Sequence, residues 1–327
     1  MKALVYTGTN ASEVRDVEAP VATDGQSIVD LSFCGICGSD MHAWHGHDER
    51  RIPPLVLGHE AVGVALTGPL AGTRVAINPL MSCHDCDACD SGNHHLCASR
   101  ELIGMRYPGA FAEQVMVPDG NLTPLADHLS FSEAALAEPT AVAVRVVEIA
   151  AQASVAADSR IIILGGGAIG VLVAQVLAAR GFAAPQIAET NALRRGMLDG
   201  IGLAGSYDPL AETPADGSVD LVIDCVGMGA TRAAASAMVR PGGVIVHVGL
   251  QDNEAGLDTR RITLQEIAFI GAYCYRYEDF AAALVLLTEG KVTGAGWTEI
   301  RPLDEGAEAF IDIDQGRAPP KIILATS

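Results

Sequence analysis

The sequence predicts an α/β protein in which a mostly-β domain is joined to a domain with a doubly wound parallel sheet. Three observations support this fold class. The chain has 327 residues, more than the roughly 250–300 residues that one hydrophobic core usually serves. Short strand-like segments bounded by Gly and Pro predominate in the first 140 residues. Beyond them, strand-like and helix-like segments alternate, which is typical of a parallel sheet covered by helices.

The first 140 residues are predicted to form mainly strands and loops. The segments whose patterns favour strands are 1–8, 29–33, 61–66 and 74–77. Ser39 can cap a short helix through Asp40–Trp44. A further helix is expected to begin at Ser132. Glu138–Pro139 should interrupt it, with the proline at the first position of the next helix, which carries Ala141–Ala150.

The second part of the chain is predicted to build the parallel sheet. Its expected strands are 161–164, 186–189, 220–224 and 243–250, and its expected helices are 168–180, 191–199 and 229–239. This alternation predicts a doubly wound arrangement. The tail is predicted to contain a helix at 278–289 and a final strand, KIILA.

Composition excludes some classes of partner. The chain carries 40 Asp and Glu against 21 Lys and Arg, a formal net charge of −19. Nucleic-acid binding needs a basic surface, and so does a membrane-surface helix, so neither is expected. The opening residues lack the pattern of a secretory signal. The apolar segments at 134–151 and 171–184 are broken by charged residues. We therefore expect a cytoplasmic protein with reduced thiols.

Four cysteines lie within fifteen residues, in the segment CHDCDACDSGNHHLC. Cys83, Cys86, Cys89 and Cys97 are spaced C-x2-C-x2-C-x7-C, in a stretch without hydrophobic periodicity. This spacing favours a closed tetrahedral zinc site, which contributes folding free energy. Disulfides are the alternative, and a reducing compartment disfavours them.

A glycine loop follows the strand expected at 161–164. LGGGAIG gives Gly165-x-Gly167-x-x-Gly170 at the start of a helix, the arrangement that holds a dinucleotide pyrophosphate on a helix N-terminus. Glu189 lies 19 residues after the last glycine, where a carboxylate can bind ribose hydroxyls and repel a 2′-phosphate. NAD is therefore expected. The neighbouring Arg194 and Arg195 keep NADP as the alternative.

A second group of metal-type residues lies upstream of the cysteine cluster. FCGICGSDMH contains Cys37, Ser39, Asp40 and His42, and LGHEAVG contains His59 and Glu60. Thiolate, imidazole and carboxylate are the ligand types of catalytic zinc sites, which keep one position open. Each residue alone is ambiguous, because a lone Cys is usually a small buried hydrophobe.

Taken together, these motifs resemble the zinc-dependent medium-chain alcohol dehydrogenases. The matching segments, in family order, are 34–42, 58–60, 83–97, 109–113, 137–139 and 165–170. Within that family the chain is most similar to the polyol and L-threonine dehydrogenases, because Glu60 follows the histidine and Glu138 stands where other members have a cysteine. The resemblance implies a GroES-like catalytic domain at about 1–140, completed by 275–327, and a Rossmann domain at about 141–274. The active site is expected between them.

The resemblance also implies roles for individual residues. Cys37 and His59 are expected to bind a catalytic zinc. Glu60 is expected to be a third ligand or a close partner, and Glu138 a fourth ligand or the group that holds the zinc-bound water. The cysteine cluster would hold a second, structural zinc. The residues expected at the cofactor are Gly165, Gly167, Ala168, Ile169, Gly170, Glu189, Val226, Val248 and Leu250.

The expected reaction is hydride transfer between a secondary alcohol and NAD. Zinc would acidify the substrate hydroxyl, and Ser39 and His42 would pass the released proton to solvent. The alternative for these two residues is a helix cap and a surface histidine. A small vicinal diol, polyol or sugar alcohol is the expected substrate, and L-threonine is the alternative.

Two further interpretations differ in class. One is a zinc-free quinone or enone reductase, which both metal-type groups oppose. The other is a non-enzymatic protein-interaction module built on the cysteine cluster as a zinc ribbon. The family resemblance also implies a homo-oligomer, either a dimer or a tetramer.

Overall fold

The computed structural model describes residues 1–203 and 205–326, and the chain divides into two compact units. The first unit comprises Met1–Glu138, Arg276–Gly294 and Thr298–Ser327. The second comprises Pro139–Tyr275 and Ala295–Trp297. In the described ranges, no helix is both long enough and apolar enough to cross a membrane.

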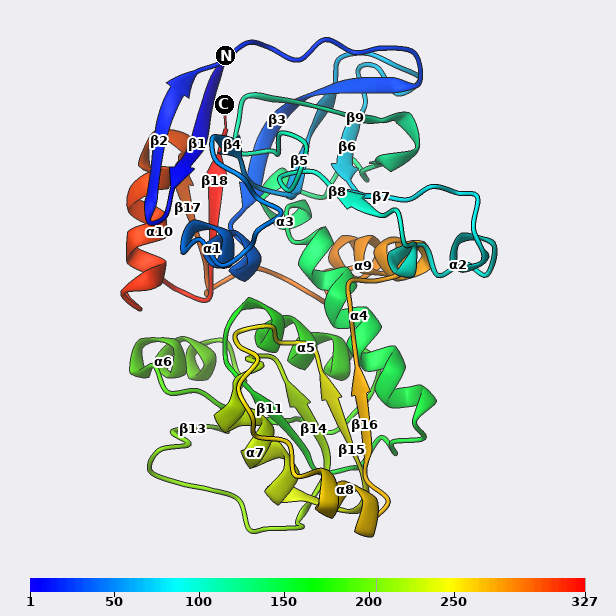
Figure 1. Cartoon of the computed structure of the whole chain (residues 1–327), viewed down its shortest axis with the longest axis vertical. Helices are drawn as coiled ribbons and strands as arrows, with labels where there is room; N and C mark the ends of the chain where they lie inside the picture. The colour runs from blue at the N-terminus through cyan, green and yellow to red at the C-terminus, as the bar shows by residue number, and fades with distance from the viewer. Residues whose placement is uncertain (204, 327) are drawn as a thin grey trace. The chain divides into compact units, whose positions relative to one another are not determined.

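The first unit is built mainly from strands (Figure 1). Its strands are β1 (Lys2–Gly8), β2 (Ala11–Asp16), β3 (Gln26–Gly35), β4 (Leu55–Val56), β5 (Glu60–Ala65), β6 (Arg74–Ile77), β7 (Leu80–Met81), β8 (Glu101–Leu102), β9 (Gln114–Pro118), β10 (Leu122–Pro124), β17 (Thr298–Pro302) and β18 (Lys321–Ala325). Its helices are α1 (Gly38–Trp44), α2 (Asp87–Asp90), α3 (Phe131–Ala134), α9 (Tyr277–Thr288) and α10 (Gly306–Asp314). Helix α4 (Ala137–Gln152) begins in this unit and continues in the second.

One sheet of the first unit joins segments that are far apart in the sequence. Its strand order is β10-β6-β5-β3-β18-β17, with β9 also paired to β3. The C-terminal strand β18 therefore lies beside β3, which in turn lies beside β5. Strand β3 alternates as its sequence predicts, with Val29 and Leu31 buried and Asp30 exposed. The core around this sheet includes the fully buried ring of Phe111, which packs edge-on against Phe310.

Two details of the predicted helices in this unit are wrong. Cys37, not Ser39, is the N-cap of α1, and its sulfur accepts the N–H of Ser39 at 3.5 Å. The chain is still extended at Cys37, so the serine already lies inside the first turn. The predicted interruption also falls earlier, because α3 ends at Ala134 and α4 begins at Ala137. The proline at 139 is accepted within the first turn of α4, where its missing N–H has no helical partner.

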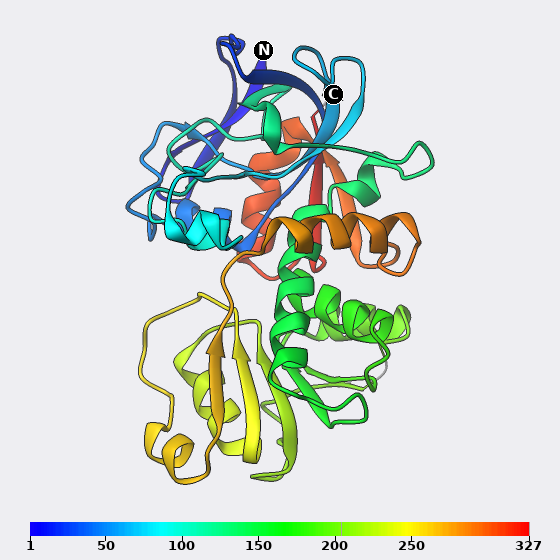
Figure 2. The same ribbon diagram turned by 90° about the vertical axis from the view of Figure 1, so that its right-hand side faces the viewer.

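The second unit contains a parallel sheet. Its elements are β11 (Ile161–Leu164), α5 (Ala168–Ala179), β12 (Gln186–Ala188), α6 (Ala192–Gly200), β13 (Ser206–Tyr207), β14 (Val219–Asp224), α7 (Gly229–Met238), β15 (Val239–His247), α8 (Thr259–Leu264) and β16 (Ala268–Gly271). The order β13-β12-β11-β14-β15-β16 places the chain reversal between β11 and β14. Helices cover both faces of this sheet (Figure 2). The predicted α/β fold class is confirmed.

The apolar strands of this sheet follow from burial on both faces. Residues 161–164 are all buried, which explains why every residue in this segment of the sequence is apolar. Strand β15 ends at His247, three residues before the end of the strand predicted from sequence. Val248 and Leu250 therefore lie in the turn after the strand. Helices α8 and α10 and strand β16 are not predicted from the sequence, because they are short or lack a clear apolar period.

Candidate active site and metal centres

The four cysteines of the cluster converge on one point. The ligand atoms of Cys83, Cys86, Cys89 and Cys97 all lie within 4.8 Å of one another. Sulfur–sulfur distances are 3.9 Å for Cys83–Cys89, 3.6 Å for Cys86–Cys89 and 3.4 Å for Cys83–Cys97. Four sulfurs about 2.3 Å from a tetrahedral zinc would lie about 3.8 Å apart, whereas a disulfide needs about 2.05 Å. The donor set fits a closed zinc site, and the cysteines are all free.

The thiols of the cluster differ in pKa. Backbone hydrogen bonds lower the pKa of Cys97 to about 7. The amide of Asp85 lowers the pKa of Cys83, but hydrogen bonds with the neighbouring thiols outweigh it and raise that pKa to about 12. Without a cation, the four sulfurs would therefore share protons unequally. Next to the cluster, the ring of His94 stacks on Tyr277 of α9 at 4.2 Å.

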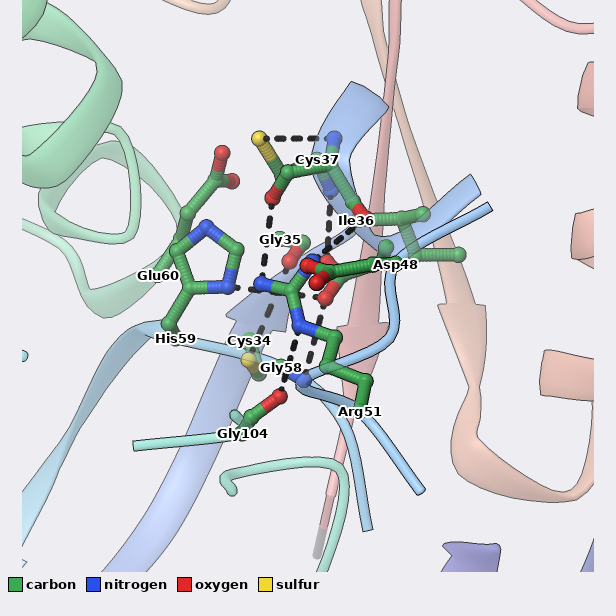
Figure 3. A network of polar contacts seen from close by, with 12 residues as sticks. Cys34, Gly35, Ile36, Cys37, Asp48, Arg51, Gly58, His59, Glu60 and Gly104 are labelled. Carbon is green, nitrogen blue, oxygen red and sulfur yellow. Dashed lines mark hydrogen bonds and ion pairs between the residues drawn. The ribbon is translucent and has the colours of Figure 1, made fainter. Parts of the chain in front are cut away.

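A second group of ligand-type atoms lies where β3, α1 and β5 meet. The ligand atoms of Cys37, His59 and Glu60 lie within 4.8 Å of one another. Figure 3 shows the sulfur, the imidazole and the carboxylate on one side of the turn between β3 and α1. Sulfur, nitrogen and oxygen from three residues form the donor set of a catalytic zinc site with an open position. His59 and Glu60 thus lie close to Cys37 in the structure, although His59 is 22 residues away from it in the sequence.

Asp40 holds this turn together from a completely buried position. Its carboxylate accepts the N–H of Cys37 at 3.0 Å and that of Gly58 at 3.3 Å. Its Oδ1 lies 3.5 Å from Nδ1 of His59. A carboxylate behind a ligating imidazole is the usual partner that orients the ring. Burial lowers the pKa of His59, but the charge of Asp40 opposes it and the net pKa is well above the usual range.

The carboxylate of Glu60 is bound by a buried lysine. Lys321 Nζ donates to Glu60 Oε1 at 2.7 Å and also contacts Oε2, and it donates to the carbonyl of Ile36 at 2.9 Å. Burial lowers the pKa of Lys321, but the charge of Glu60 outweighs it and the net pKa is raised. Both carboxylate oxygens are therefore already engaged by a cation.

The side chains of Glu60 and Lys321 meet across Gly35 of the strand between them. In the sheet, Gly35 of β3 pairs with Glu60 of β5 on one side and with Ile323 of β18 on the other. A Cβ atom on Gly35 would lie 2.0 Å from Glu60 Oε2. The absent side chain at this position gives the carboxylate the room to reach the lysine across the middle strand.

Glu138 is buried near this site but is not part of the convergent group. It is 7% exposed and lies in the first turn of α4. Its charge is one of those that raise the pKa of Lys321. Among the described residues, the groups whose ligand atoms lie within 4.8 Å of one another do not include Glu138.

Ser39 and His42 lie on α1 in different surroundings. Arg51, buried beside the helix, donates to the carbonyl of Ser39 at 2.6 Å and lies 3.4 Å from its hydroxyl oxygen. The same guanidinium donates to the carbonyl of Gly104 at 2.9 Å. His42 is half-buried, and its ring meets that of His47 at 5.3 Å. Burial and His47 together lower the pKa of His42.

The glycine loop of the second unit has the geometry that its sequence predicts. Gly165 has φ +99°, which favours glycine. A Cβ on Gly170 would lie 1.9 Å from the carbonyl oxygen of Gly165, so close packing requires a glycine there. Gly167 is the N-cap of α5 and has open space where a Cβ would point. Ala168 and Ile169 form the first turn, whose N–H groups can bind an anion.

Glu189 lies beside this loop. Its carboxylate accepts the N–H of Gly166 at 2.9 Å and that of Asn191 at 2.7 Å. Arg195 donates to the carbonyl of Glu189 at 2.6 Å and pairs with Asp208 at 3.2 Å. The Nε atom of Arg194, by contrast, is buried without a hydrogen-bond partner in the described part of the chain.

Three residues that support the Cys37–His59–Glu60 site have no supporting role in the prediction from sequence, although Asp40 is named there within the metal-type segment. Asp40 had a recognisable signal, because an acid three residues after an N-cap forms a capping box. Lys321 and Arg51 had none. Lys321 is 261 residues from Glu60 and meets it only through the strand order β18-β3-β5.

Comparison with known families agrees with this geometry. Residues 23–127 match the family described as the alcohol dehydrogenase GroES-like domain. Residues 168–289 match the family described as zinc-binding dehydrogenase. The two matched regions together span more than half of the chain.

Individual relatives extend the match over most of the chain. It is 32% identical over 292 residues to L-galactonate-5-dehydrogenase of Escherichia coli K12, covering 84% of each protein. It is 29% identical to a D-xylulose reductase A of Aspergillus fumigatus, covering 95% of this chain and 91% of the relative. A zinc-binding dehydrogenase of Sinorhizobium meliloti 1021, solved with NADP, superposes with a TM-score of 0.87 at 27% identity, covering 99% and 98%. The chain therefore belongs to the zinc-binding alcohol dehydrogenase family, as its sequence motifs indicate.

Proposed function

We propose that the protein oxidises a secondary hydroxyl of a polyol, sugar alcohol or vicinal diol with NAD, using one catalytic and one structural zinc. The convergence of the ligand atoms of Cys37, His59 and Glu60 is the observation that carries this proposal. Zinc supplies a Lewis acid that lowers the pKa of a hydroxyl, and the nicotinamide supplies the hydride acceptor. The proposed catalytic domain comprises about 1–140 and 275–327, and the cofactor domain about 141–274.

Residues around the proposed catalytic zinc divide into ligands and supports. Cys37 and His59 would bind the metal directly, and Asp40 would orient the imidazole. Glu60 would serve as a partner that reaches the metal only by sharing its oxygens with Lys321. A thiolate with one unshared carboxylate would leave the centre formally neutral, so the lysine keeps it more electrophilic. Glu138, which is buried and whose charge reaches Lys321, would hold a water or substrate oxygen rather than bind the metal.

Ser39 and His42 would carry the released proton. The hydroxyl of Ser39 lies on α1 two residues after Cys37, and Arg51 takes one of its lone pairs. Its own proton can then point away from the guanidinium, toward the next acceptor. The lowered pKa of His42 keeps the imidazole neutral at pH 7, so that it can accept a proton.

Cofactor choice would be set by Glu189. Two backbone N–H groups bind its carboxylate, but a carboxylate has about four lone-pair positions, so ribose hydroxyls can still donate to it. A 2′-phosphate would meet its negative charge, which supports NAD. Arg195 is already bound to protein oxygens, while Arg194 could turn toward a phosphate and is the reason to test NADP as well. The other proposed contacts are Gly165, Gly167, Ala168, Ile169, Gly170, Val226, Val248 and Leu250.

The substrate class draws its support from the relatives. The names of the two compared enzymes, L-galactonate-5-dehydrogenase and D-xylulose reductase, both describe polyhydroxylated carbon chains. We further propose a cytoplasmic homo-oligomer. The free cysteines suit a reducing compartment, and β16 leaves an open sheet edge that a second copy could cover.

A substrate panel tests the proposal. Zinc-replete protein would be mixed with polyols, 2,3-butanediol, L-galactonate and L-threonine, each with NAD and with NADP, and reduced cofactor followed by absorbance. We expect reduction with at least one polyhydroxylated substrate, and faster with NAD. A higher rate with L-threonine would overturn the substrate class. No turnover together with no NADH binding would overturn the enzymatic function.

A further inference from the structure

Asp224 ends β14 with a completely buried carboxylate that the proposed chemistry does not use. Its Oδ1 accepts the N–H groups of Val226 at 3.0 Å and Gly227 at 2.9 Å. Its Oδ2 accepts the hydroxyl of Thr231 at 2.9 Å and lies 3.2 Å from Nδ1 of His247. One side chain thus joins the turn after β14, the start of α7 and the end of β15.

The backbone of Asp224 adds a second connection. Its carbonyl oxygen accepts the N–H groups of Val248 and Gly249, each at 3.0 Å. The turns after β14 and β15 also touch directly, because a Cβ on Gly227 would lie 2.2 Å from the backbone of Gly249. The carbonyl of Val226 accepts the N–H of residue 251 at 3.2 Å, which closes the contact from the other side.

These two turns lie at the place where a parallel sheet binds its ligand. Strand β14 is the neighbour of β11 across the reversal of strand order, and β15 follows it (Figure 1). Ligands of such sheets bind at the carboxyl ends of the strands at this point. A Cβ on Gly165 would lie 2.6 Å from the side chain of Val226, so the turn after β14 borders the glycine loop. A dinucleotide whose pyrophosphate sits on that loop would extend its second half over these turns.

The charge on Asp224 is stabilised by its partners. Burial raises its pKa, but hydrogen bonds from His247, Gly227 and Thr231 outweigh burial and hold the pKa below the usual range. A buried carboxylate is costly unless such donors compensate it. Its donors lie in the turn after β14, in α7 and at the end of β15, so the charge helps to fix their mutual arrangement. Arg232 links the same two turns further along the chain, because it donates to the carbonyl of Gly227 at 2.9 Å and to Asp252 at 2.6 Å.

We propose that Asp224 is a positioning residue for the dinucleotide, which holds the turns after β14 and β15 in the arrangement that receives the nicotinamide half. This inference rests on the proposed function. Asp224 does not touch the reacting atoms, and it acts through Val226, Val248 and Leu250. Its loss should therefore weaken cofactor binding without changing the zinc content or the affinity for the alcohol.

The experiment compares Asp224→Asn with Asp220→Asn. Asp220 lies on the same strand at the opposite end, where it contacts Arg240 and accepts the N–H of Arg160 at 2.7 Å. Both variants remove a paired carboxylate from β14, so both should lower the melting temperature. Titration with NADH, followed by fluorescence, should give a Kd about tenfold or more higher for Asp224→Asn. Asp220→Asn should keep the wild-type Kd, and KM for the alcohol at saturating NAD should be unchanged in both.

Three outcomes decide the proposal. Equal NADH affinity in the two variants would overturn it, because Asp224 would then serve stability alone. If Asp224→Asn does not fold, Thr231→Val removes a single donor and should still raise the Kd severalfold, and a wild-type Kd there would overturn it. If the wild-type protein binds neither NADH nor NADPH, the proposed function itself fails and this inference fails with it.

Discussion

The two metal-type centres of the first unit are built in opposite ways. The cysteine cluster takes four like ligands from one short loop, and all four ligand atoms that converge are sulfur. The Cys37–His59–Glu60 site takes three unlike ligands from two segments, and buried Asp40, Arg51 and Lys321 surround it. A closed sulfur set can do little except bind metal and stabilise the loop. An open mixed set needs supports that keep each ligand in place while one position stays available.

This difference predicts how each centre responds to loss of a ligand. Cys97→Ser should release the zinc of the cluster and unfold the loop, because a structural zinc contributes much of the folding free energy of its site. We expect the first thermal transition to fall by about 10 °C and activity to fall with it. Calorimetry together with elemental analysis measures both. A variant with wild-type stability and only one zinc would show that the cluster is not structural.

Lys321→Met sharpens the comparison, because it removes a support of the Cys37–His59–Glu60 site and leaves the four cysteines unchanged. In the metal-free protein, the substitution leaves the buried Glu60 carboxylate without its cation, which should cost about 3–5 kcal/mol of unfolding free energy. With Glu60 free to bind zinc through both oxygens, kcat should fall and the metal should resist chelation. Denaturant unfolding and timed chelation test both effects.

A surface lysine supplies the matched control for this variant. Lys291 pairs with Glu289 at 2.8 Å with about half of each side chain exposed. Lys291→Met should therefore cost less than about 1 kcal/mol and leave kcat unchanged. Equal costs for the two lysine variants would mean that Lys321 does not support the metal site.

His42→Ala should give the smallest effect, a change in pH dependence. Because burial and His47 lower the pKa of His42, activity should fall on the acid side only below the usual imidazole value of about 6.5. As pH falls through the lowered pKa, His42 protonates and can no longer accept the released proton. In the variant, the fall in activity on the acid side should disappear, and kcat should be roughly tenfold lower than in the wild type. A pH–rate profile that matches the wild type would remove His42 from the relay.

The same pKa shift has a consequence for stability. The unfolded chain binds a proton at His42 more readily than the folded chain does, so stability is lost as pH falls through the folded pKa. His47→Ala removes a neighbouring positive charge and should move the acid limb toward higher pH. Kinetics and thermal melts on the same pH series test the two effects together.

The two centres also differ in how far the sequence predicts them. The cysteine cluster is evident because its ligands are close together, and local spacing fixes their geometry. Cys37 and His59 could be picked out as ligand types, but only the pairing of β3 with β5 brings them together. Lys321 could not be predicted, because its place depends on β18 joining the same sheet. The role of Asp224 could not be predicted either. In the sequence it is one residue of a mainly apolar strand, and its role depends on the turns after β14 and β15, which contact each other only in the folded chain.

Zinc counting on His59→Ala tests the central claim most directly, which is that the two centres hold separate metals with separate purposes. Elemental analysis of the wild type should give two zincs per chain. His59→Ala should retain one zinc. It should also keep the wild-type melting temperature of the cysteine-cluster loop and the wild-type affinity for NADH, but it should lose nearly all alcohol oxidation. A variant that keeps both zincs and its activity, or a wild type that holds only one, would contradict the account.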